Sequence, residues 1–144
     1  EEAVRLMTHP GVGPVNALAF VLTIGPVTRF RRSKQVASYL GLNPSEHSSG
    51  GRQRTGAISK QGSTLMRWLL IEGAQTAARL DPELRQDYQR LKFRRGGAVA
   101  KVAIARKLAV RMYWMLRSGA DYARLVRVQG SPGATLVDAS SSSG

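Results

Sequence analysis

The sequence predicts an all-α fold, a compact bundle of about five helices, and three observations support this class. Apolar residues recur at helical spacing in several segments of the 144-residue chain. Gly and Pro residues separate these segments. No segment allows a β-strand to be assigned. Because 42% of the residues are hydrophobic, the chain can build one helical core, and we expect one domain with a short tail.

The N-terminal part is expected to form a helix, a tight turn and a second helix. Residues 1–8 carry apolar side chains at near-helical spacing, and Pro10-Gly11-Val12-Gly13-Pro14 interrupts them before an apolar stretch at residues 15–24. Ser33 is the expected N-cap of a short helix that stops at Gly41. The first two helices resemble a helix-hairpin-helix motif.

Three longer helices are predicted in the second half. Ser63 is expected to cap a helix over residues 64–80, whose inner face would hold Leu65, Leu69 and Ala77. An N-cap Asp followed by Pro opens the next helix at Asp81-Pro82, which stops near Gly96-Gly97, and the last helix spans residues 98–118. The inner stripe of that last helix is predicted to be Val102, Ala105, Ala109, Met112 and Leu116. Its basic outer face would show Lys101, Arg106, Lys107, Arg111 and Arg117.

Basic residues far outnumber acidic ones. The chain has 22 Lys and Arg against nine Asp and Glu, a formal charge of +13 and a pI near 11.4. Such a surface repels itself unless a polyanion is near, and nucleic acid is the best candidate. No apolar run approaches the roughly 20 residues of a membrane-spanning helix, and no signal peptide opens the chain, so no membrane partner and a cytoplasmic location are expected.

The basic residues occur in several runs along the chain, which favours a phosphate-tracking surface over an ordinary solvated face. The runs are Arg29, Arg31, Arg32 and Lys34; Arg52, Arg54, Lys60 and Arg67; and Arg90, Lys92, Arg94 and Arg95. Charge alone does not distinguish DNA from RNA.

No metal or other cofactor is expected to bind this chain alone. Cysteine is absent, and His9 and His47 are isolated, so the usual ligand sets for zinc are missing. Asp81, Glu83 and Asp87 form the only acidic cluster, but they lie in the first turns of a predicted helix. There they offset the helix dipole, and this structural interpretation is preferred.

The turn at Pro10–Pro14 has two interpretations. In one, Gly11 and Gly13 supply positive φ angles for a tight turn between helices. In the other, the glycines allow backbone N–H groups and a helix N-terminus to contact a phosphate, without sequence specificity.

Residues 43–62 are rich in Ser, Gly and Arg, and they predict a long loop or a small irregular hairpin. Arg52, Arg54 and Lys60 suit the oxygens of a phosphodiester, and a nearby serine could act as a nucleophile. Ser and Gly also populate ordinary solvated turns, so composition alone favours catalysis only weakly. His47 as a general base is a weaker hypothesis still.

Several spaced motifs occur in one order along the chain. They are Pro10-Gly11-Val12-Gly13-Pro14, Arg29-Phe30-Arg31, Tyr39-Leu40-Gly41-Leu42-Asn43-Pro44, Ser48-Ser49-Gly50-Gly51, Gly56-Ala57-Ile58-Ser59-Lys60-Gln61-Gly62 and Leu65-Met66-Arg67-Trp68-Leu69-Leu70. In this order they resemble the C-terminal transposase domain of the insertion-sequence 110/116/902 family, over about residues 6–119.

The resemblance implies a DNA recombinase in which Ser49, or else Ser48, attacks a DNA phosphodiester and forms a phosphoserine link. It also implies a separate RuvC-like domain with acidic Mg²⁺ ligands, a structured bridge RNA and a homo-oligomer in the parent protein. Arg52, Arg54, Lys60 and Arg67 would then hold the scissile phosphate or the RNA. The chain starts at Glu1 without Met, so it is expected to be a piece of that protein that does not cleave DNA unaided.

On this basis residues 1–9 are expected to end a connecting coiled-coil helix, residues 10–119 to form the transposase domain, and residues 120–144 to be a flexible tail. Two alternatives stay open: a non-catalytic DNA- or RNA-binding module of helix-hairpin-helix type, and a basic protein-interaction or ribosome-associated domain.

Overall fold

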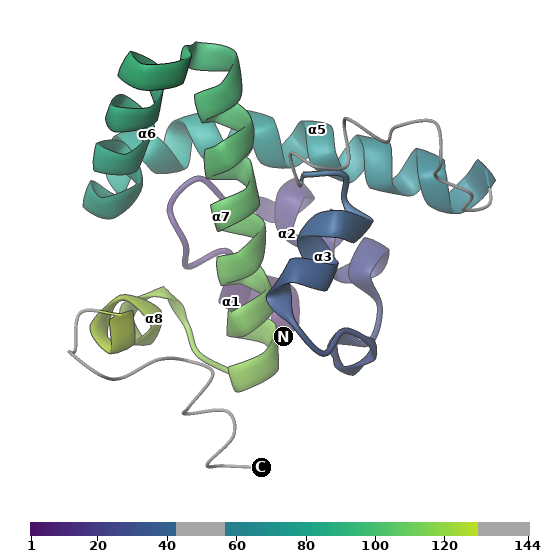
Figure 1. The fold of residues 1–144 in the computed structure, drawn as a ribbon. Helices are drawn as coiled ribbons and strands as arrows, with labels where there is room; N and C mark the ends of the chain where they lie inside the picture. Colours follow the sequence, from purple (N-terminus) through teal and green to yellow (C-terminus); the bar gives the residue numbers. More distant parts are fainter. Residues whose placement is uncertain (43–56, 130–144) are drawn as a thin grey trace.

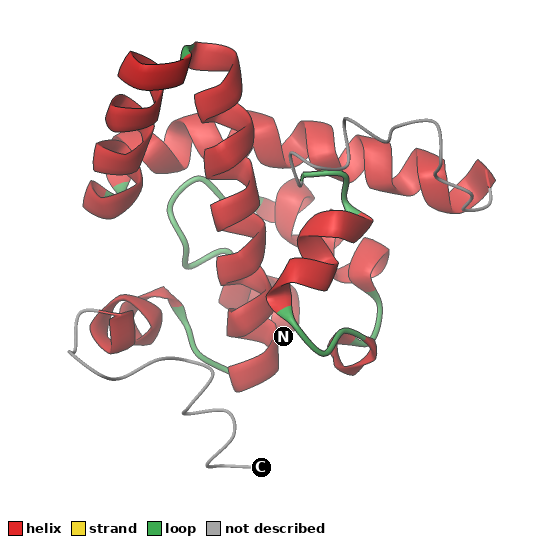
Figure 2. Cartoon of the chain, in the orientation of Figure 1, coloured by secondary structure: helices red, strands yellow, loops and turns green. Residues whose placement is uncertain are grey.

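The computed structural model of the chain describes residues 1–42 and 57–129. The described residues form helices only, joined by turns (Figure 2). In chain order they are α1 (Glu2–Leu6), α2 (Pro14–Ile24), the 3-10 helix η1 (Val27–Arg29), α3 (Ser33–Tyr39), α5 (Ala57–Leu80), α6 (Pro82–Arg95), α7 (Gly97–Ser118) and α8 (Tyr122–Gln129). The all-α class predicted from the sequence is therefore confirmed.

Helix α7 is the central element of the bundle. It contacts α1, α3, α5, α6, α8 and η1 (Figure 1). In Figure 1, α6 lies beside α7 on one side and α3 on the other, while α5 crosses behind α7. Helix α2 packs on α5 and α1. The elements that flank residues 43–56, α3 and α5, are thus both held by α7.

The predicted stripe of α7 is buried, but the buried surface of the helix is wider than predicted. Ala105, Ala109, Met112 and Leu116 belong to the core, as expected, and Val102 packs half-buried against it. The helix also buries Ile104, Leu108, Tyr113 and Met115. Because helices pack around α7 on several sides, its apolar surface exceeds the single stripe of a surface helix.

Helix α5 begins earlier than predicted. Its first residue is Ala57, so residues 57–62 extend the helix instead of the Ser-Gly-Arg loop, and Ser63 is not an N-cap. Ala, Ile, Lys and Gln at the start of this segment are compatible with a helix, and one interior Gly costs only about 1 kcal/mol. Residues 43–56, which hold the rest of the predicted loop, lie outside the described residues.

The buried face of α5 agrees with the predicted one at Ala77, which is fully buried, and at Leu69, which packs against the core, but it differs elsewhere. Met66 and Leu70 are fully buried, whereas Leu65 and Trp68 are more than half exposed. Gly73, Ala74 and Ala77 continue the buried face. Small residues there bring α5 close to its neighbours. Gly and Ala contribute little to an apolar periodic pattern in the sequence, because they carry little hydrophobic surface.

The ends of two helices test the predicted caps. Asp81 caps α6, where its carboxylate accepts a hydrogen bond from the Leu84 amide at 2.9 Å, as predicted. The N-cap of α3 is Arg32, and the Ser33 prediction is wrong by one residue. The Gln35 side chain accepts hydrogen bonds from the backbone of Arg31 and Arg32 and satisfies amides at this helix start.

Part of the expected tail is ordered structure. Residues 122–129 form α8, and Leu125 is fully buried in the core. The Tyr122 hydroxyl donates to the Asp81 carboxylate at the start of α6. The prediction of a flexible tail from residue 120 is therefore wrong for this segment, and residues 130–144 lie outside the described part of the chain.

The turn between α1 and α2 packs directly on α5. Gly11 has a φ of +86°, and a Cβ added there would lie 2.7 Å from both the Ala77 nitrogen and the Gly73 oxygen. A Cβ on Gly73 would lie 2.7 Å from Asn16 Nδ2 and 2.9 Å from the Gly11 oxygen. Both glycines are therefore required by a close backbone approach as well as, at Gly11, by the left-handed conformation.

Replacement of Gly11 by Ala should therefore destabilise the fold by about 2–4 kcal/mol, since it adds backbone strain and a collision with α5. Chemical denaturation measures the free energy of unfolding. Gly13→Ala is the matched control, because a Cβ there meets nothing within 4 Å and the φ angle is −91°. It should cost roughly 0.5 kcal/mol. Equal losses at the two positions would contradict the packing argument.

Candidate nucleic-acid interface

The residues predicted to carry catalysis fall outside the described structure. Ser48, Ser49, Arg52 and Arg54 all lie within residues 43–56, as does His47. The structure does describe both ends of this segment. Leu42, just before it, is fully buried, and α5 starts directly after it at Ala57. Two packed elements therefore fix where the serine-bearing segment leaves and re-enters the bundle.

Two of the predicted phosphate ligands are on α5, beside these ends. Lys60 lies in the first turn of the helix. Arg67 lies two turns further along, and its guanidinium packs against Gly41, where an added Cβ would be 3.2 Å from Arg67 Nη1. Gly41 has a φ of +71° and directly precedes Leu42. Arg67 thus places a positive charge where the serine-bearing segment begins.

The two glycines of the predicted hairpin have different environments. Gly11 is packed against the backbone of α5, as described above, which gives it a structural role. Gly13 is exposed and is the N-cap of α2, where no side chain caps the helix. The first free amides of α2 are therefore at the surface, and of the two glycines only Gly13 is placed to approach a phosphate.

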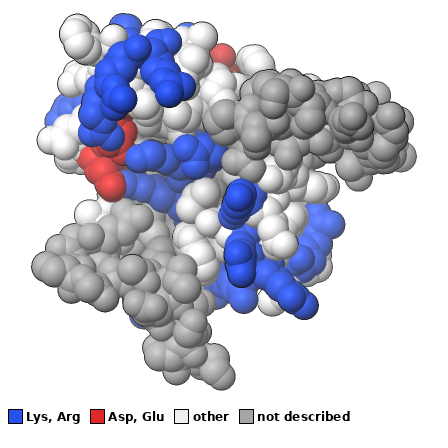
Figure 3. Space-filling model, viewed as in Figure 1, with Lys and Arg blue, Asp and Glu red and all other residues white. Residues whose placement is uncertain are grey.

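Basic side chains gather on one face of the bundle. Figure 3 shows Lys and Arg across the end of α6, the middle of α7 and the region of α3, with few acidic side chains between them. We call this surface the basic face. The elements that form it carry exposed or half-buried cations, which are Arg31, Arg32 and Lys34 near α3, Arg106, Lys107 and Arg117 on α7, and Arg90, Lys92, Arg94 and Arg95 on α6.

Hydrogen bonds hold the three parts of the basic face together. On one side, Arg117 Nη1 donates to the Phe30 carbonyl at 2.7 Å, and the Tyr113 hydroxyl donates to the same oxygen at 2.8 Å. On the other side, Lys107 bonds Asp87, which also accepts from Arg90 at 2.7 Å. The face is therefore built on fixed contacts between α3, α7 and α6.

One member of the basic face has unused hydrogen-bonding capacity. Arg106 is half-buried on α7, and its Nε is a buried atom without a hydrogen-bond partner in the described structure. Buried polar atoms normally have partners, so the unsatisfied Nε shows that the internal contacts of the bundle do not use the full hydrogen-bonding capacity of this guanidinium. A phosphate oxygen is an acceptor suited to a guanidinium.

The acidic residues predicted to be structural do form internal ion pairs. Asp81 pairs with Arg111 at 2.9 Å, Glu83 pairs with the same guanidinium, and Asp87 pairs with Lys107 and Arg90. Within residues 1–42 and 57–129 there is no cluster of acids and histidines able to hold a metal ion. These carboxylates therefore do not fit a Mg²⁺ site, because their oxygens are already bonded to cations.

Arg111 is buried, although the sequence predicts it on the exposed basic face of α7. It is 5% exposed. Its Nη1 bonds both the Asp81 carboxylate at 2.9 Å and His9 Nε2 at 3.1 Å. The spacing of Ile104, Leu108, Arg111 and Met115 on one side of the helix is the signal in the sequence that indicates this burial.

His9 completes this buried network. Its Nδ1 donates to the Pro10 carbonyl at 2.8 Å, so Nε2 is the acceptor for Arg111, and the ring packs edge-on against Tyr122. Burial, with the nearby Arg111 charge, lowers the pKa of His9 to about 4. Burial, with the adjacent Asp81 carboxylate, raises the pKa of Tyr122 to about 12. At neutral pH His9 is therefore uncharged and Asp81 is the anion.

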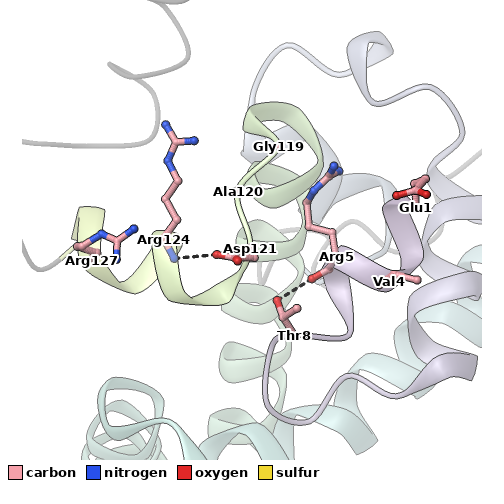
Figure 4. A pocket seen from close by; sticks show the side chains of 9 residues that line it. All are labelled: Glu1, Val4, Arg5, Thr8, Gly119, Ala120, Asp121, Arg124 and Arg127. Atoms are coloured by element: carbon pink, nitrogen blue, oxygen red, sulfur yellow. Dashed lines mark hydrogen bonds between the residues drawn. The ribbon is translucent and has the colours of Figure 1, made fainter.

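A shallow pocket of about 480 Å³ lies between α1 and α8 (Figure 4). Arg5, Arg124 and Arg127 line it together with the acids Glu1 and Asp121. Its polar groups also bond locally: the Arg124 amide donates to Asp121 at 3.0 Å, and Thr8 Oγ1 donates to the Arg5 carbonyl at 2.7 Å. Mixed charge makes it a weaker phosphate site than the basic face.

Comparison with known proteins establishes the family. The sequence model of the family described as transposase IS116/IS110/IS902 matches residues 3–89, which run from α1 into α6 as far as Gln89 and include the serine pair. The chain belongs to the IS116/IS110/IS902 transposase family. The resemblance found in the order of the sequence motifs is thereby confirmed.

Individual transposases agree with this assignment. The chain is 42% identical over 118 residues to a probable family 20 transposase of Pseudomonas aeruginosa, covering 79% of this chain and 35% of that protein. It is 39% identical over 79 residues to the transposase for insertion sequence element IS1111A of Coxiella burnetii, covering 55% and 22%. The chain thus spans about a third or less of the length of these relatives.

Two further comparisons bear on this member of the transposase family. No solved structure matches the chain. Among its described helices, none combines the length and the apolar character needed to cross a membrane.

The buried His9 predicts how the stability of this transposase domain depends on pH. The pKa of His9 is lower in the folded than in the unfolded chain. The stabilisation that uncharged His9 gives the fold is therefore complete above about pH 6.5 and is lost as the pH falls towards 4. Between pH 7.5 and 5, the free energy of unfolding should fall by about 2 kcal/mol. The pKa values of Asp81 and Asp87 are lowered, because hydrogen bonds and cations outweigh their burial, so their contributions are lost only at lower pH.

Urea denaturation at several pH values measures this dependence. His9→Gln should flatten the curve between pH 7.5 and 5, whereas His47→Gln removes the other histidine of the chain and should leave the curve unchanged. If His9→Gln kept the full pH dependence of the free energy of unfolding, a different titratable group would have to cause that dependence.

Proposed function

We propose that the chain is the DNA-binding domain of an insertion-sequence transposase and that it supplies a serine nucleophile for strand cleavage and exchange. The observation that carries this proposal is the family match over residues 3–89, which spans the Ser48-Ser49 pair. The flanking elements support it, because α3 and α5, which precede and follow this segment in the chain, both pack on α7. Ser49 is the first candidate nucleophile and Ser48 the second.

In the proposed chemistry, Ser49 Oγ bonds to the phosphorus of a DNA phosphodiester while the bond from phosphorus to one sugar oxygen breaks. The sugar oxygen leaves as a hydroxyl, the serine proton passes to a base, and a phosphoserine link remains. A hydroxyl of another strand then displaces the serine and restores a phosphodiester. Arg67, with Arg52, Arg54 and Lys60, would balance the negative charge of the phosphate oxygens.

Other parts of the parent protein are needed for this reaction in our proposal. The resemblance implies a RuvC-like domain whose acidic residues hold Mg²⁺, which would activate the phosphodiester. It also implies a structured bridge RNA and a homo-oligomer. Asp81, Glu83 and Asp87 are bonded to Arg and Lys, and the part of the chain that the structure describes holds no cluster of acids and histidines suited to such a metal site. The task of this domain is therefore to bind DNA and to present the serine.

The basic face supports the DNA-binding part of the proposal. Arg31 and Lys34 lie exposed on the α3 side, and Arg94 and Arg95 lie exposed on the α6 side, with no ion pair to any described acid. Asp81, Glu83 and Asp87 neutralise only Arg111, Lys107 and Arg90. The remaining cations are therefore available to replace the counterions of a phosphate backbone.

A second candidate function is a helix-hairpin-helix-type DNA- or RNA-binding module without covalent chemistry. One observation favours it: the exposed Gly13 starts α2 with uncapped amides, which suit a phosphate. In that case binding would survive every serine substitution, and no covalent link would form.

Binding of a short DNA duplex should weaken steeply with salt, and Arg31→Gln with Lys34→Gln should reduce the slope of log affinity against log salt. The slope should fall by about 0.9 for each phosphate that the variant no longer neutralises. Fluorescence anisotropy over a range of salt concentrations measures it. Arg79→Gln, an exposed cation of α5 outside the basic face, is the charge-matched control and should leave the slope unchanged. If Arg79→Gln reduced the slope and Arg31→Gln with Lys34→Gln did not, the DNA interface would lie outside the basic face.

In the full-length transposase, supplied with Mg²⁺, guide RNA and DNA, Ser49→Ala should abolish a covalent protein–DNA adduct while DNA affinity persists. Denaturing gel electrophoresis of labelled DNA detects the adduct. Survival of the adduct in Ser49→Ala but not in Ser48→Ala would assign the attack to Ser48. A wild-type protein that recombines DNA without any adduct would support the binding-module function instead.

A further inference from the structure

An aromatic side chain stands fully in solvent at the end of α6. Phe93 is 92% exposed, the highest value among the exposed large apolar side chains of the described residues. It lies in the last turn of the helix, before α6 ends at Arg95. The buried residues of α6, Leu84 and Asp87, lie in its first half. Phe93 therefore contributes nothing to the core.

The turn after Phe93 makes this end of α6 a projecting tip. Gly96, with a φ of +96°, is at once the C-cap of α6 and the N-cap of α7. The two helices meet there at an outer edge of the bundle (Figure 1). Such a tight connection between two packed helices is short and stiff, so the Phe93 ring is held outward on a rigid support.

The surroundings of Phe93 are unusual for a solitary exposed apolar residue. Single exposed apolar residues are common and need no explanation by themselves. Here, however, Lys92, Arg94 and Arg95 are exposed beside the ring, and no ion pair joins them to a described acid. Cations in the last turn of a helix offset the helix dipole. That effect does not require three cations, and it does not require a solvent-exposed phenyl ring.

An aromatic ring flanked by cations matches the chemistry of a nucleic acid strand. A nucleobase offers a flat π face for stacking, and the phosphates on either side of it are acceptors for Lys and Arg. Within a paired duplex both faces of a base are covered by its neighbours. The available partner is therefore a base that is unpaired or has been displaced from its stack.

We propose that Phe93 stacks on an unpaired nucleobase of the DNA bound along the basic face, while Lys92, Arg94 and Arg95 hold the flanking phosphates. This inference rests on the proposed DNA-binding function and adds a specific contact to it. The tip is continuous with the basic face through Arg90, which bonds Asp87, the partner of Lys107 on α7. One strand can therefore contact the tip and α7 together.

A lipid surface is the other partner that cations around an exposed Phe would suit. The observations favour DNA for two reasons. The tip offers only Phe93 and, in the first turn of α7, the less exposed Val99, and two such side chains bury too little area for a stable interfacial anchor. The cations also extend away from the tip over α7 to α3, as a phosphate-tracking surface requires (Figure 3).

The test uses the 144-residue chain and two DNA duplexes that differ only by one extra, unpaired 2-aminopurine. Wild type should bind the bulged duplex more tightly than the paired one and should quench the 2-aminopurine fluorescence. Phe93→Ala should lower affinity for the bulged duplex about ten-fold, remove the quenching and leave affinity for the paired duplex unchanged. Phe93→Trp should retain both the affinity and the quenching.

Matched variants separate stacking from other effects. Leu22→Ala removes a 72% exposed side chain of α2 and should change nothing. Phe93→Leu keeps apolar character without a ring and should behave like Phe93→Ala. Circular dichroism should show folded protein for all of them, because both sites are exposed. Arg94→Gln with Arg95→Gln should weaken binding to both duplexes alike.

The ways in which this proposal can fail are distinguishable. If wild type binds both duplexes but Phe93→Ala acts on neither or on both equally, the stacking contact is refuted and the proposed function stands. If wild type binds neither duplex, the proposed DNA-binding function fails and takes this inference with it. Phe93-dependent binding to vesicles of anionic phospholipid, without preference for the bulged duplex, would assign the tip to a lipid surface instead.

Discussion

The fold depends on how one buried positive charge is satisfied. Arg111 lies in the middle of the central helix, and a guanidinium removed from water is stable only when it is paired and hydrogen-bonded. Its three partners come from two places: Asp81 and Glu83 at the start of α6, and His9 at the turn after α1. Removing Asp81 would break the buried part of this network and leave Glu83, which is largely exposed, as the only anionic partner of Arg111; breaking a buried pair typically costs about 3–5 kcal/mol. One side chain of α7 thus fixes the positions of α1 and α6.

The same arrangement shapes the electrostatics of the surface. The chain has few acids, and the structure places Asp81, Glu83 and Asp87 against cations of α7 and α6. These acids therefore contribute to internal cohesion and little to the outer field. The cations towards α3 and at the end of α6 stay uncompensated by described acids. An excess of basic residues thereby becomes a directional surface with one strongly positive face.

A local pattern in the sequence predicts an element correctly where contacts between neighbouring residues determine the structure. An Asp followed by Pro predicts the start of α6 correctly, because the cap is made within one turn. Tertiary packing decides elsewhere. Arg111 is buried because distant residues supply its partners, and no pattern within α7 shows them. The beginning of α5 at Ala57 was missed because Ser and Gly within the helix resemble a loop. The serine pair was located by family motifs, since composition alone does not distinguish a nucleophile from a turn residue.

The contact between Gly11 and Gly73 links the turn after α1 to the middle of α5 through backbone atoms alone. A larger residue at either position has to separate the two elements, and the separation moves the start of α2. In sequences of other members of the family, these two positions should therefore covary. Where one of these positions holds a larger residue, the other cannot compensate, because no residue is smaller than Gly. Both glycines should then be lost together with this packing of the turn on α5.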